Sequence, residues 1–153
     1  MVRFHPFRGW RYNPEVVGDL ASVLCPPYDL IGPEMEQSLA RQSPYNAVHL
    51  EGAEQPDWQQ PAHLRYTRAA ALFQQWRSAD VLRRDREPGF YLLQHSFSHQ
   101  GQTKSRLALF GCVGLEEYEQ RRILPHELTH APAVQDRVSL IESCGANFSP
   151  IMA

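Results

Sequence analysis

The sequence has no excess of charge of either sign. Its 153 residues include 15 Lys and Arg against 17 Asp and Glu, so the formal net charge is −2. A near-neutral balance disfavours nucleic acid as a partner, because binding through general electrostatics needs a concentrated basic surface. The charged fraction of 21% and the hydrophobic fraction of 42% exclude a largely disordered chain. The length predicts about one domain.

Cysteine is scarce, and long apolar runs are absent. The three cysteines, at positions 25, 112 and 144, form no C-x-x-C pair, which disfavours a disulfide framework and a structural zinc knuckle. The longest apolar stretch, Leu107 to Leu115, has half the length of the about 20 residues that a membrane span needs. No secretory signal is visible at the start. We therefore expect a cytoplasmic protein without a membrane partner.

Three common motifs of enzymes and nucleotide-binding proteins are also missing. The sequence contains no G-x-x-x-x-G-K-[ST] phosphate loop, no G-x-G-x-x-G turn and no G-x-S-x-G nucleophile elbow. A self-contained loop that cradles phosphate is therefore not evident.

The elements that the sequence does predict are short, because 12 Pro and nine Gly are spread through it. Gly32-Pro33-Glu34 is typical of a helix start and predicts a helix over 33–41. Apolar spacing predicts the clearest helix over 61–79, and residues 45–50 read as a short strand. Two further strands, 91–97 and 105–115, flank a loop and predict a hairpin.

A last helix is expected around 136–143. Helices and strands do not alternate in a regular β-α-β period, so the class that we expect is α+β. The expected architecture is a small mixed sheet with a hairpin and two to three helices.

The segment His126-Glu127-Leu128-Thr129-His130 matches the H-E-x-x-H pattern of zinc hydrolases. That chemistry needs two His one helical turn apart to hold the metal, and a Glu to activate water. Pro132 follows so soon after His130 that a helix here could hold barely two turns. Zinc held by His126 and His130 is therefore an alternative rather than our first hypothesis, and a structural loop is another.

A site without a metal has support from the same region. Glu127 beside His126 makes an acid–base pair that could work near neutral pH. Arg137 could hold a phosphate or carboxylate through two hydrogen bonds, with Asp136 next to it. The alternative for Asp136 and Arg137 is a helix N-cap with a surface ion pair.

Two other clusters carry polar side chains on stiff or aromatic segments. In Cys25-Pro26-Pro27-Tyr28-Asp29, two prolines stiffen the turn that presents Tyr28 and Asp29, as in many binding sites. Asp29 could equally cap the helix that starts at Pro33. Residues 7–12, Phe-Arg-Gly-Trp-Arg-Tyr, interleave arginine with aromatic rings, which could make an exposed edge for a partner.

Seven segments, taken in order, resemble a bacterial and archaeal family known as domain-of-unknown-function family 1015. They cover nearly the whole chain and are FRGWRYN near the start, CPPYDLI at 25–31, YNAVHLE at 45–51, YTRA at 66–69 leading to Trp76, HELT at 126–129, QDR at 135–137 and ANFSPI at 146–151. The family pattern reads His-Glu-x-Thr, so the resemblance favours Thr129 over His130 as a functional residue. Asn147 in the last segment is a candidate for the same reason.

The resemblance implies a longer protein, of which this chain would be the N-terminal portion. It also implies a relationship to ParB-like and sulfiredoxin-like folds, some of which use nucleotides. A nucleotide or phosphorylated small molecule, with Mg²⁺ as a companion ion, is the expected ligand. The family carries no established reaction, so the resemblance does not decide whether the protein is an enzyme.

Our first hypothesis therefore joins the resemblance to the polar clusters. Glu127 and His126 would be acid–base or metal-positioning groups, and Arg137 would anchor the anion. The remaining ligand-binding candidates would be Asp136, Tyr28, Asp29, Thr129 and Asn147. The alternatives are the zinc-dependent hydrolase and a non-catalytic interaction module that uses residues 7–12.

Overall fold

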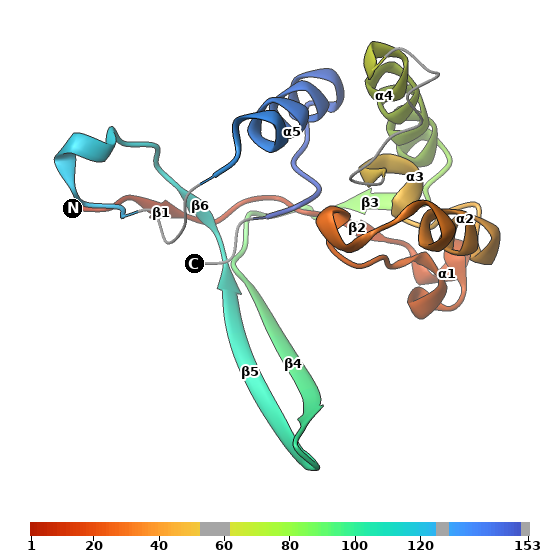
Figure 1. The fold of residues 1–153 in the computed structure, drawn as a ribbon, viewed down its shortest axis with the longest axis horizontal. Coiled ribbons are helices and arrows are strands. Elements are labelled where there is room, and N and C mark those ends of the chain that lie inside the picture. Colours follow the sequence, from red (N-terminus) through yellow and green to blue (C-terminus); the bar gives the residue numbers. More distant parts are fainter. Residues whose placement is uncertain (53–61, 125–128, 151–153) are drawn as a thin grey trace. The chain divides into compact units, whose positions relative to one another are not determined.

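The computed structural model describes residues 1–52, 62–124 and 129–150. The chain divides into two compact units. The first joins Met1–Arg11 to Arg84–His126, and the second joins Tyr12–Arg83 to Glu127–Ala153. Three two-stranded sheets pair β1 with β6, β2 with β3, and β4 with β5 (Figure 1).

The first unit consists mainly of strands. β1 (Phe4–His5) pairs antiparallel with β6 (Cys112–Val113), and the long strands β4 (Tyr91–His99) and β5 (Gln102–Phe110) form a hairpin. A short 3₁₀ helix, η3 (Tyr118–Gln120), follows β6. The predicted hairpin is therefore confirmed.

The hairpin turn is shorter than the loop predicted between residues 97 and 105, because β4 extends to His99 and β5 begins at Gln102. Gln100 and Gly101 both have positive φ, at 51° and 73°, which is typical of a two-residue turn matching the twist of the strands. The strand predicted over 105–115 also stops early, at Phe110. A side chain at Gly111 would overlap the ring of Phe4, so glycine lets β1 approach where the chain leaves β5 for β6.

The second unit is mainly helical. Its longer helices are α2 (Pro33–Gln42), α4 (Ala62–Ser78) and α5 (Ala131–Cys144). The shorter elements are α1 (Pro14–Val17), the 3₁₀ helices η1 (Leu20–Val23) and η2 (Tyr28–Leu30), and α3 (Val48–Glu51). The strands β2 (Trp10–Tyr12) and β3 (Leu82–Arg84) form a small sheet at the points where the chain passes between the units, because Arg11 and Arg84 belong to the first unit. The helices predicted over 33–41 and 61–79 are thus confirmed within a residue or two.

The core of this unit lies against one face of α4. Ala69, Phe73 and Trp76 recur at helical spacing and are each no more than 3% exposed. Leu140 of α5 is 4% exposed, and α4 and α5 contact each other. A second apolar group joins Ile31 and Val48 to Cys25, Leu39 and Ala40.

The strand predicted over 45–50 is wrong, and a buried asparagine explains why. Asn46 is fully buried, and its side-chain oxygen accepts a hydrogen bond from the backbone N–H of Val48 at 3.0 Å. Its amide group donates to the carbonyls of Ser22 and Leu24 at 2.8 and 2.9 Å. Asn46 therefore turns the chain into α3, because it satisfies the first donor of the helix.

The last helix begins five residues earlier than predicted. Pro132 lies in the first turn of α5, where its missing N–H costs no hydrogen bond, and His130 is the N-cap residue. Asp136 is consequently in the middle of the helix, so the interpretation of Asp136 as an N-cap is wrong. The alternative prediction that Asp29 caps α2 is wrong as well. Gly32 is the N-cap residue of α2, and no side chain caps this helix.

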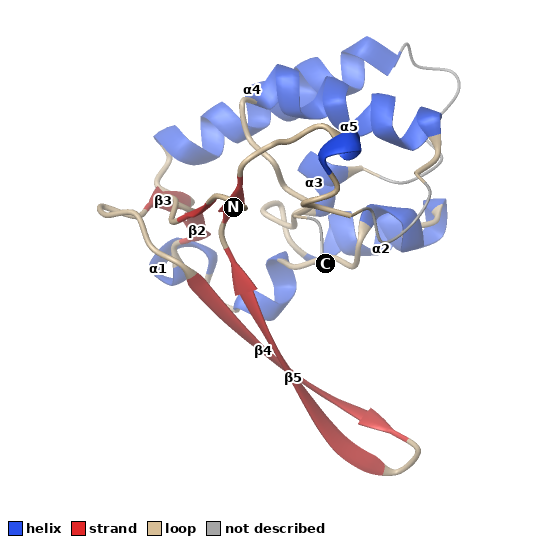
Figure 2. Cartoon of the chain, turned by 90° about the vertical axis from the view of Figure 1, so that its left-hand side faces the viewer, coloured by secondary structure: helices blue, strands red, loops and turns tan. Residues whose placement is uncertain are grey.

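The α+β class is confirmed by these helices and small antiparallel sheets. Among the described residues, none of the helices has the length and apolar character to cross a membrane. Figure 2 shows the same division into helices and strands from the side, with β4 and β5 as one extended hairpin.

Candidate functional site

Arg137, on α5, lies at the centre of a network of charged and hydroxyl side chains in the second unit. Its Nη1 donates to Glu51 Oε2 at 2.6 Å, and its Nε donates to Asp136 Oδ2 at 2.9 Å. Nη2 also contacts Asp136, and it reaches the Glu51 carbonyl at 3.3 Å. Only 17% of the Arg137 side chain is exposed, so these bonds form largely away from water.

The Asp136 carboxylate accepts hydrogen bonds from side chains of two helices, α4 and α5. Its Oδ1 accepts hydrogen bonds from Arg65 and from the Tyr66 hydroxyl, the latter at 2.7 Å, and both donors belong to α4. Its Oδ2 faces Arg137. Two guanidinium groups and one phenol thus surround a single carboxylate that is 23% exposed.

Glu51 is the other acidic partner of Arg137 and lies at the end of α3. Its side chain is 7% exposed, and its second oxygen, Oε1, accepts a hydrogen bond from the Ser149 hydroxyl at 2.6 Å. Phe148 packs edge-on against Phe73 with ring centroids 5.2 Å apart, and this contact holds the segment that carries Ser149. A buried carboxylate is costly unless it is paired, and Glu51 has both a cation and a hydroxyl.

Tyr28, on η2, covers the same arginine. The Arg137 Cζ lies 3.9 Å from the centroid of the Tyr28 ring, within the range of a cation–π contact. Tyr28 and Arg137, two of the predicted ligand-binding residues, therefore contact each other. Asp29, the next residue, is exposed, and no contact of its side chain with this network is recorded among the described residues.

These residues make up what we call the arginine cluster: Tyr28, Glu51, Arg65, Tyr66, Asp136, Arg137 and Ser149. Its two arginines are balanced by two carboxylates. Because the donors already converge on one anionic group, the geometry is suited to holding an anion between α4 and α5.

The other predicted residues lie outside this cluster or outside the described residues. Asn147 is exposed, and its side-chain oxygen accepts a hydrogen bond from the Ser149 backbone N–H at 3.1 Å. Thr129 and His130 are exposed and precede α5. His126 and Glu127 fall in the segment 125–128, which is not described, so their predicted acid–base role stays a prediction.

A zinc site at the H-E-x-x-H pattern would need both His on one helix. His130 has an extended backbone at the start of α5, with φ −86° and ψ 125°, so it does not lie inside a helix. Within the described residues, no group of three His, Cys, Asp or Glu is placed to hold a metal ion.

Four members of the cluster were not among the predicted site residues, namely Glu51, Arg65, Tyr66 and Ser149. Glu51 could have been singled out from the sequence, because it is an acidic residue that directly follows the apolar positions Val48 and Leu50. Arg65 and Tyr66 lie close to the predicted core face of α4. Their partner Asp136 is 71 residues from Arg65 and 70 from Tyr66, so only the tertiary structure pairs them.

Cys25 lies near the cluster and is no candidate nucleophile at neutral pH. Burial raises the pKa of its thiol to about 11, and the nearby Glu51 carboxylate adds to the shift. The thiolate is the reactive form of cysteine, so Cys25 is expected to be inert.

In the first unit, a second polar cluster contains the two arginines of the predicted aromatic–arginine segment, Arg8 and Arg11. Arg11 donates to both oxygens of Asp85, with Nη2 to Oδ1 at 2.6 Å, and the Tyr91 hydroxyl donates to Asp85 Oδ2 at 2.5 Å. Arg8 donates to the backbone carbonyl of Asp85 at 2.7 Å. Hydrogen bonds to Arg11 and Tyr91 hold the pKa of Asp85 below its usual value. These arginines have partners inside the unit, which weakens the hypothesis that they form a free edge for a partner.

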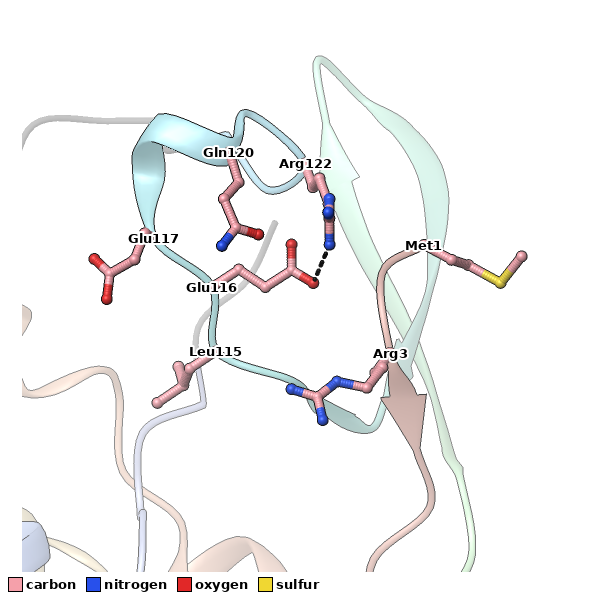
Figure 3. A pocket seen from close by; sticks show the side chains of 7 residues that line it. All are labelled: Met1, Arg3, Leu115, Glu116, Glu117, Gln120 and Arg122. Carbon is pink, nitrogen blue, oxygen red and sulfur yellow. Dashed lines mark hydrogen bonds and ion pairs between the residues drawn. The ribbon is translucent and has the colours of Figure 1, made fainter.

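A pocket of about 530 Å³ lies in the first unit and contains none of the predicted site residues. Figure 3 shows Glu116 pointing between Gln120 and Arg122, with Arg3 below them. Glu116 Oε1 pairs with Arg122 Nη1 at 3.4 Å, and its other oxygen has no hydrogen-bond partner in the part of the chain that the structure describes. The pocket is lined by Met1, Arg3, Leu115, Glu116, Glu117, Gln120 and Arg122.

The model of a family described as "Protein of unknown function (DUF1015)" matches residues 4–153. Searches of curated proteins and of solved structures give no match.

Proposed function

The chain belongs to the DUF1015 family of proteins of unknown function, and from its arginine cluster we propose that it binds a nucleotide or another phosphorylated small molecule. The observation that carries the proposal is the convergence of Arg65 and Arg137, from two different helices, on the carboxylate of Asp136. We expect the protein to act in the cytoplasm, where such ligands are abundant.

The donors around Asp136 have the chemistry that a phosphate needs. Guanidinium groups donate in a planar fork that matches two phosphate oxygens, and the Tyr66 hydroxyl adds a third donor. In the free protein, the Asp136 carboxylate accepts hydrogen bonds from these donors and balances their positive charge. The carboxylate therefore stands where a ligand anion would bind.

A phosphate group can compete with this carboxylate because it carries more charge. At neutral pH it has a charge of about −1.5 to −2 and three strong acceptor oxygens, whereas a carboxylate has one negative charge. The side chains of Arg65 and Asp136 are each 23% exposed, so the exchange can start from solvent. Mg²⁺ would accompany a nucleotide and lower the repulsion between its phosphates and the displaced Asp136.

The other cluster residues hold the donors in place. Glu51 and Tyr28 fix the plane of the Arg137 guanidinium, through a hydrogen bond at 2.6 Å and a ring contact at 3.9 Å. Ser149 in turn holds Glu51. An arginine whose fork is already oriented loses less side-chain freedom when it binds an anion.

Isothermal titration calorimetry of the full chain against ATP, ADP and CTP, each with and without Mg²⁺, tests the proposal. We expect binding of at least one of them. Arg65→Gln and Arg137→Gln should weaken that affinity about 10- to 100-fold, because each removes a charge-assisted hydrogen bond. Arg41→Gln is the matched control, since Arg41 is an exposed arginine of α2 that bonds only to Gln37 among the contacts described.

The variant Asp136→Asn separates ligand binding from a purely structural network. If the proposal holds, removing the internal anion strengthens nucleotide binding, because the donors are no longer neutralised. If the network only stabilises the fold, Asp136→Asn lowers stability and creates no affinity. Absence of binding to all three nucleotides in the wild-type protein, shown to be folded by circular dichroism, removes the proposal.

A further inference from the structure

Ser149 and Glu51 form a serine–carboxylate pair beside the phosphate-binding donors of the arginine cluster. The Ser149 hydroxyl donates to Glu51 Oε1 at 2.6 Å, a short bond that is typical of a hydroxyl facing an ionised carboxylate. The Glu51 side chain is only 7% exposed, whereas Ser149 is partly buried. The hydroxyl proton of Ser149 therefore already points at a group that can accept it.

Both members of this pair are held in place by other residues. Arg137 Nη1 donates to the second oxygen of Glu51, Oε2, at 2.6 Å and so orients the carboxylate. The backbone N–H of Ser149 donates to the side chain of Asn147 at 3.1 Å, and the ring of Phe148 packs against α4. A hydroxyl that donates to a base, which a third group orients, is the arrangement that activates a serine as a nucleophile.

The cations beside the pair indicate which electrophile the serine would attack. Arg137 bonds to Glu51 through Nη1 and to Asp136 through Nε and Nη2, so one guanidinium joins the serine–carboxylate pair to the proposed phosphate position. The charges of Arg65 and Arg137 are suited to stabilising the negative charge of a transferring phosphoryl group. A nucleoside triphosphate is long enough to replace the Asp136 carboxylate with one phosphate and to present its terminal phosphate to Ser149.

Glu51 suits phosphoryl transfer although it is paired with a cation. The transition state of this reaction is loose, so its rate depends mainly on position and on electrostatic stabilisation rather than on a strong base. Protein kinases likewise use a carboxylate to accept the proton of the attacking hydroxyl. The pair therefore has the chemistry of a phosphate acceptor in addition to that of a hydrogen bond that stabilises the fold.

We propose that Ser149 is a nucleophile that accepts the terminal phosphoryl group of a nucleoside triphosphate, with Glu51 as its general base. This step rests on the nucleotide binding proposed above. The Ser149 Oγ attacks the γ-phosphorus, so a new Oγ–P bond forms while the bond from this phosphorus to the β-phosphate oxygen breaks. The hydroxyl proton moves to Glu51 Oε1, and the nucleoside diphosphate leaves with the electron pair of the broken bond. Phosphoserine remains on the protein, where Arg137 balances part of its charge.

Intact-mass spectrometry of the full chain after incubation with ATP and Mg²⁺ tests this proposal. We expect the mass to increase by one phosphoryl group, and peptide mapping to place that group on Ser149. Ser149→Ala should abolish the increase, whereas Ser149→Thr should retain part of it because threonine keeps a hydroxyl. Ser139→Ala is the matched control, since the Ser139 hydroxyl donates to the backbone carbonyl of Gln135 rather than to a carboxylate. This control should leave the incorporation unchanged.

The variant Glu51→Gln tests the general base separately from the nucleophile. Glutamine keeps an oxygen that accepts a hydrogen bond from Ser149 but cannot take up its proton, so we expect the incorporation to slow about 100-fold or more. Circular dichroism confirms that each variant is folded. If the Ser149 hydroxyl only stabilises the fold, Ser149→Ala lowers the free energy of unfolding and leaves the incorporation as it is in the wild-type protein, which overturns the proposal.

Calorimetry on the same samples distinguishes this proposal from the nucleotide binding on which it rests. The Ser149→Ala variant should still bind ATP, because the Ser149 hydroxyl is not one of the donors that hold the phosphate. ATP that binds to the wild-type protein without any transfer overturns the role of Ser149 and leaves nucleotide binding standing. Absence of ATP binding to the folded wild-type protein overturns both proposals.

Discussion

The guanidinium of Arg137 meets the carboxylate of Glu51 at 2.6 Å, although the two residues are 86 positions apart in sequence. The side chains are 17% and 7% exposed, so the pair joins α5 to α3 inside the second unit. A buried ion pair costs desolvation of both charges, and removing one partner leaves the other charge unpaired. We therefore expect the effects of substituting Arg137 and Glu51 on the free energy of unfolding to be strongly coupled.

We expect Arg137→Met and Glu51→Leu each to lower the free energy of unfolding by about 3 kcal/mol. The double variant should lose less than the sum of the two, by about 2 kcal/mol, because neither charge is then left unpaired. Urea unfolding followed by tryptophan fluorescence measures both quantities. Additive losses would show that the two charges do not stabilise each other.

The buried side chain of Asn46 should be among the most sensitive polar positions. Asn46→Ala leaves two backbone carbonyls and the Val48 N–H without their partner, and we expect a loss of about 3 kcal/mol. The same substitution at the exposed Asn147, which accepts one hydrogen bond, should cost less than about 1 kcal/mol. Thermal unfolding of the two variants side by side makes the comparison, and equal losses would argue against the role of Asn46 in starting α3.

The lowered pKa of Asp85 predicts how the stability of the first unit changes at low pH. Hydrogen bonds from Arg11 and then from Tyr91 hold the pKa of Asp85 below its usual value. A carboxyl group whose pKa is lower in the folded than in the unfolded state stabilises the fold fully above the unfolded pKa of about 3.9. The stabilisation is lost as the pH falls below that value toward the pKa of the folded state.

The change that tests this is Asp85→Asn. As the pH falls below about 4, the wild-type protein should lose stability more steeply than the variant, because the variant lacks the titrating group. Unfolding by urea at a series of pH values, followed by circular dichroism, gives the two slopes. Parallel slopes would mean that Asp85 does not contribute to acid sensitivity.

The three cysteines should differ in their rates of alkylation. Cys25, with a pKa of about 11, is about one part in 1000 thiolate at pH 8, whereas Cys112 is exposed. Burial also raises the pKa of Cys144. Iodoacetamide labelling followed by peptide mass spectrometry should therefore modify Cys112 first and Cys25 slowly. Labelling in denaturant is the control that should abolish the difference; rapid labelling of native Cys25 would contradict its burial.

Several features could be predicted from the sequence because they depend on neighbouring residues. Pro33 after Gly32 marks the start of α2, the periodic apolar residues mark α4, and the alternation around Gly101 marks the hairpin. The family membership followed from seven short segments in order. The relationship to ParB-like folds and the roles of His126 and Glu127 stay predictions.

Other features depended on contacts between distant segments and escaped prediction. The apolar alternation of 45–50 favours a strand, but the bonds of Asn46 to Ser22 and Leu24 outweigh that preference. Asp136 looks like a helix cap in sequence, but it lies in the middle of α5 and holds Arg65 and Tyr66 of α4. The intrinsic preference of a short segment for helix or strand contributes little free energy, and a few buried hydrogen bonds outweigh it.

The sequence by itself determined where α2, α4 and the hairpin form, that Tyr28 and Arg137 are candidate ligand-binding residues, and that no ready-made phosphate loop is evident. Only the tertiary structure decided that Glu51, Arg65, Tyr66 and Ser149 join Tyr28, Asp136 and Arg137 in one cluster. The reason is physical: periodicity and capping act within a few residues, whereas a charged cluster is formed by side chains whose pairing depends on how buried helices pack, and that packing leaves no local signal in the chain.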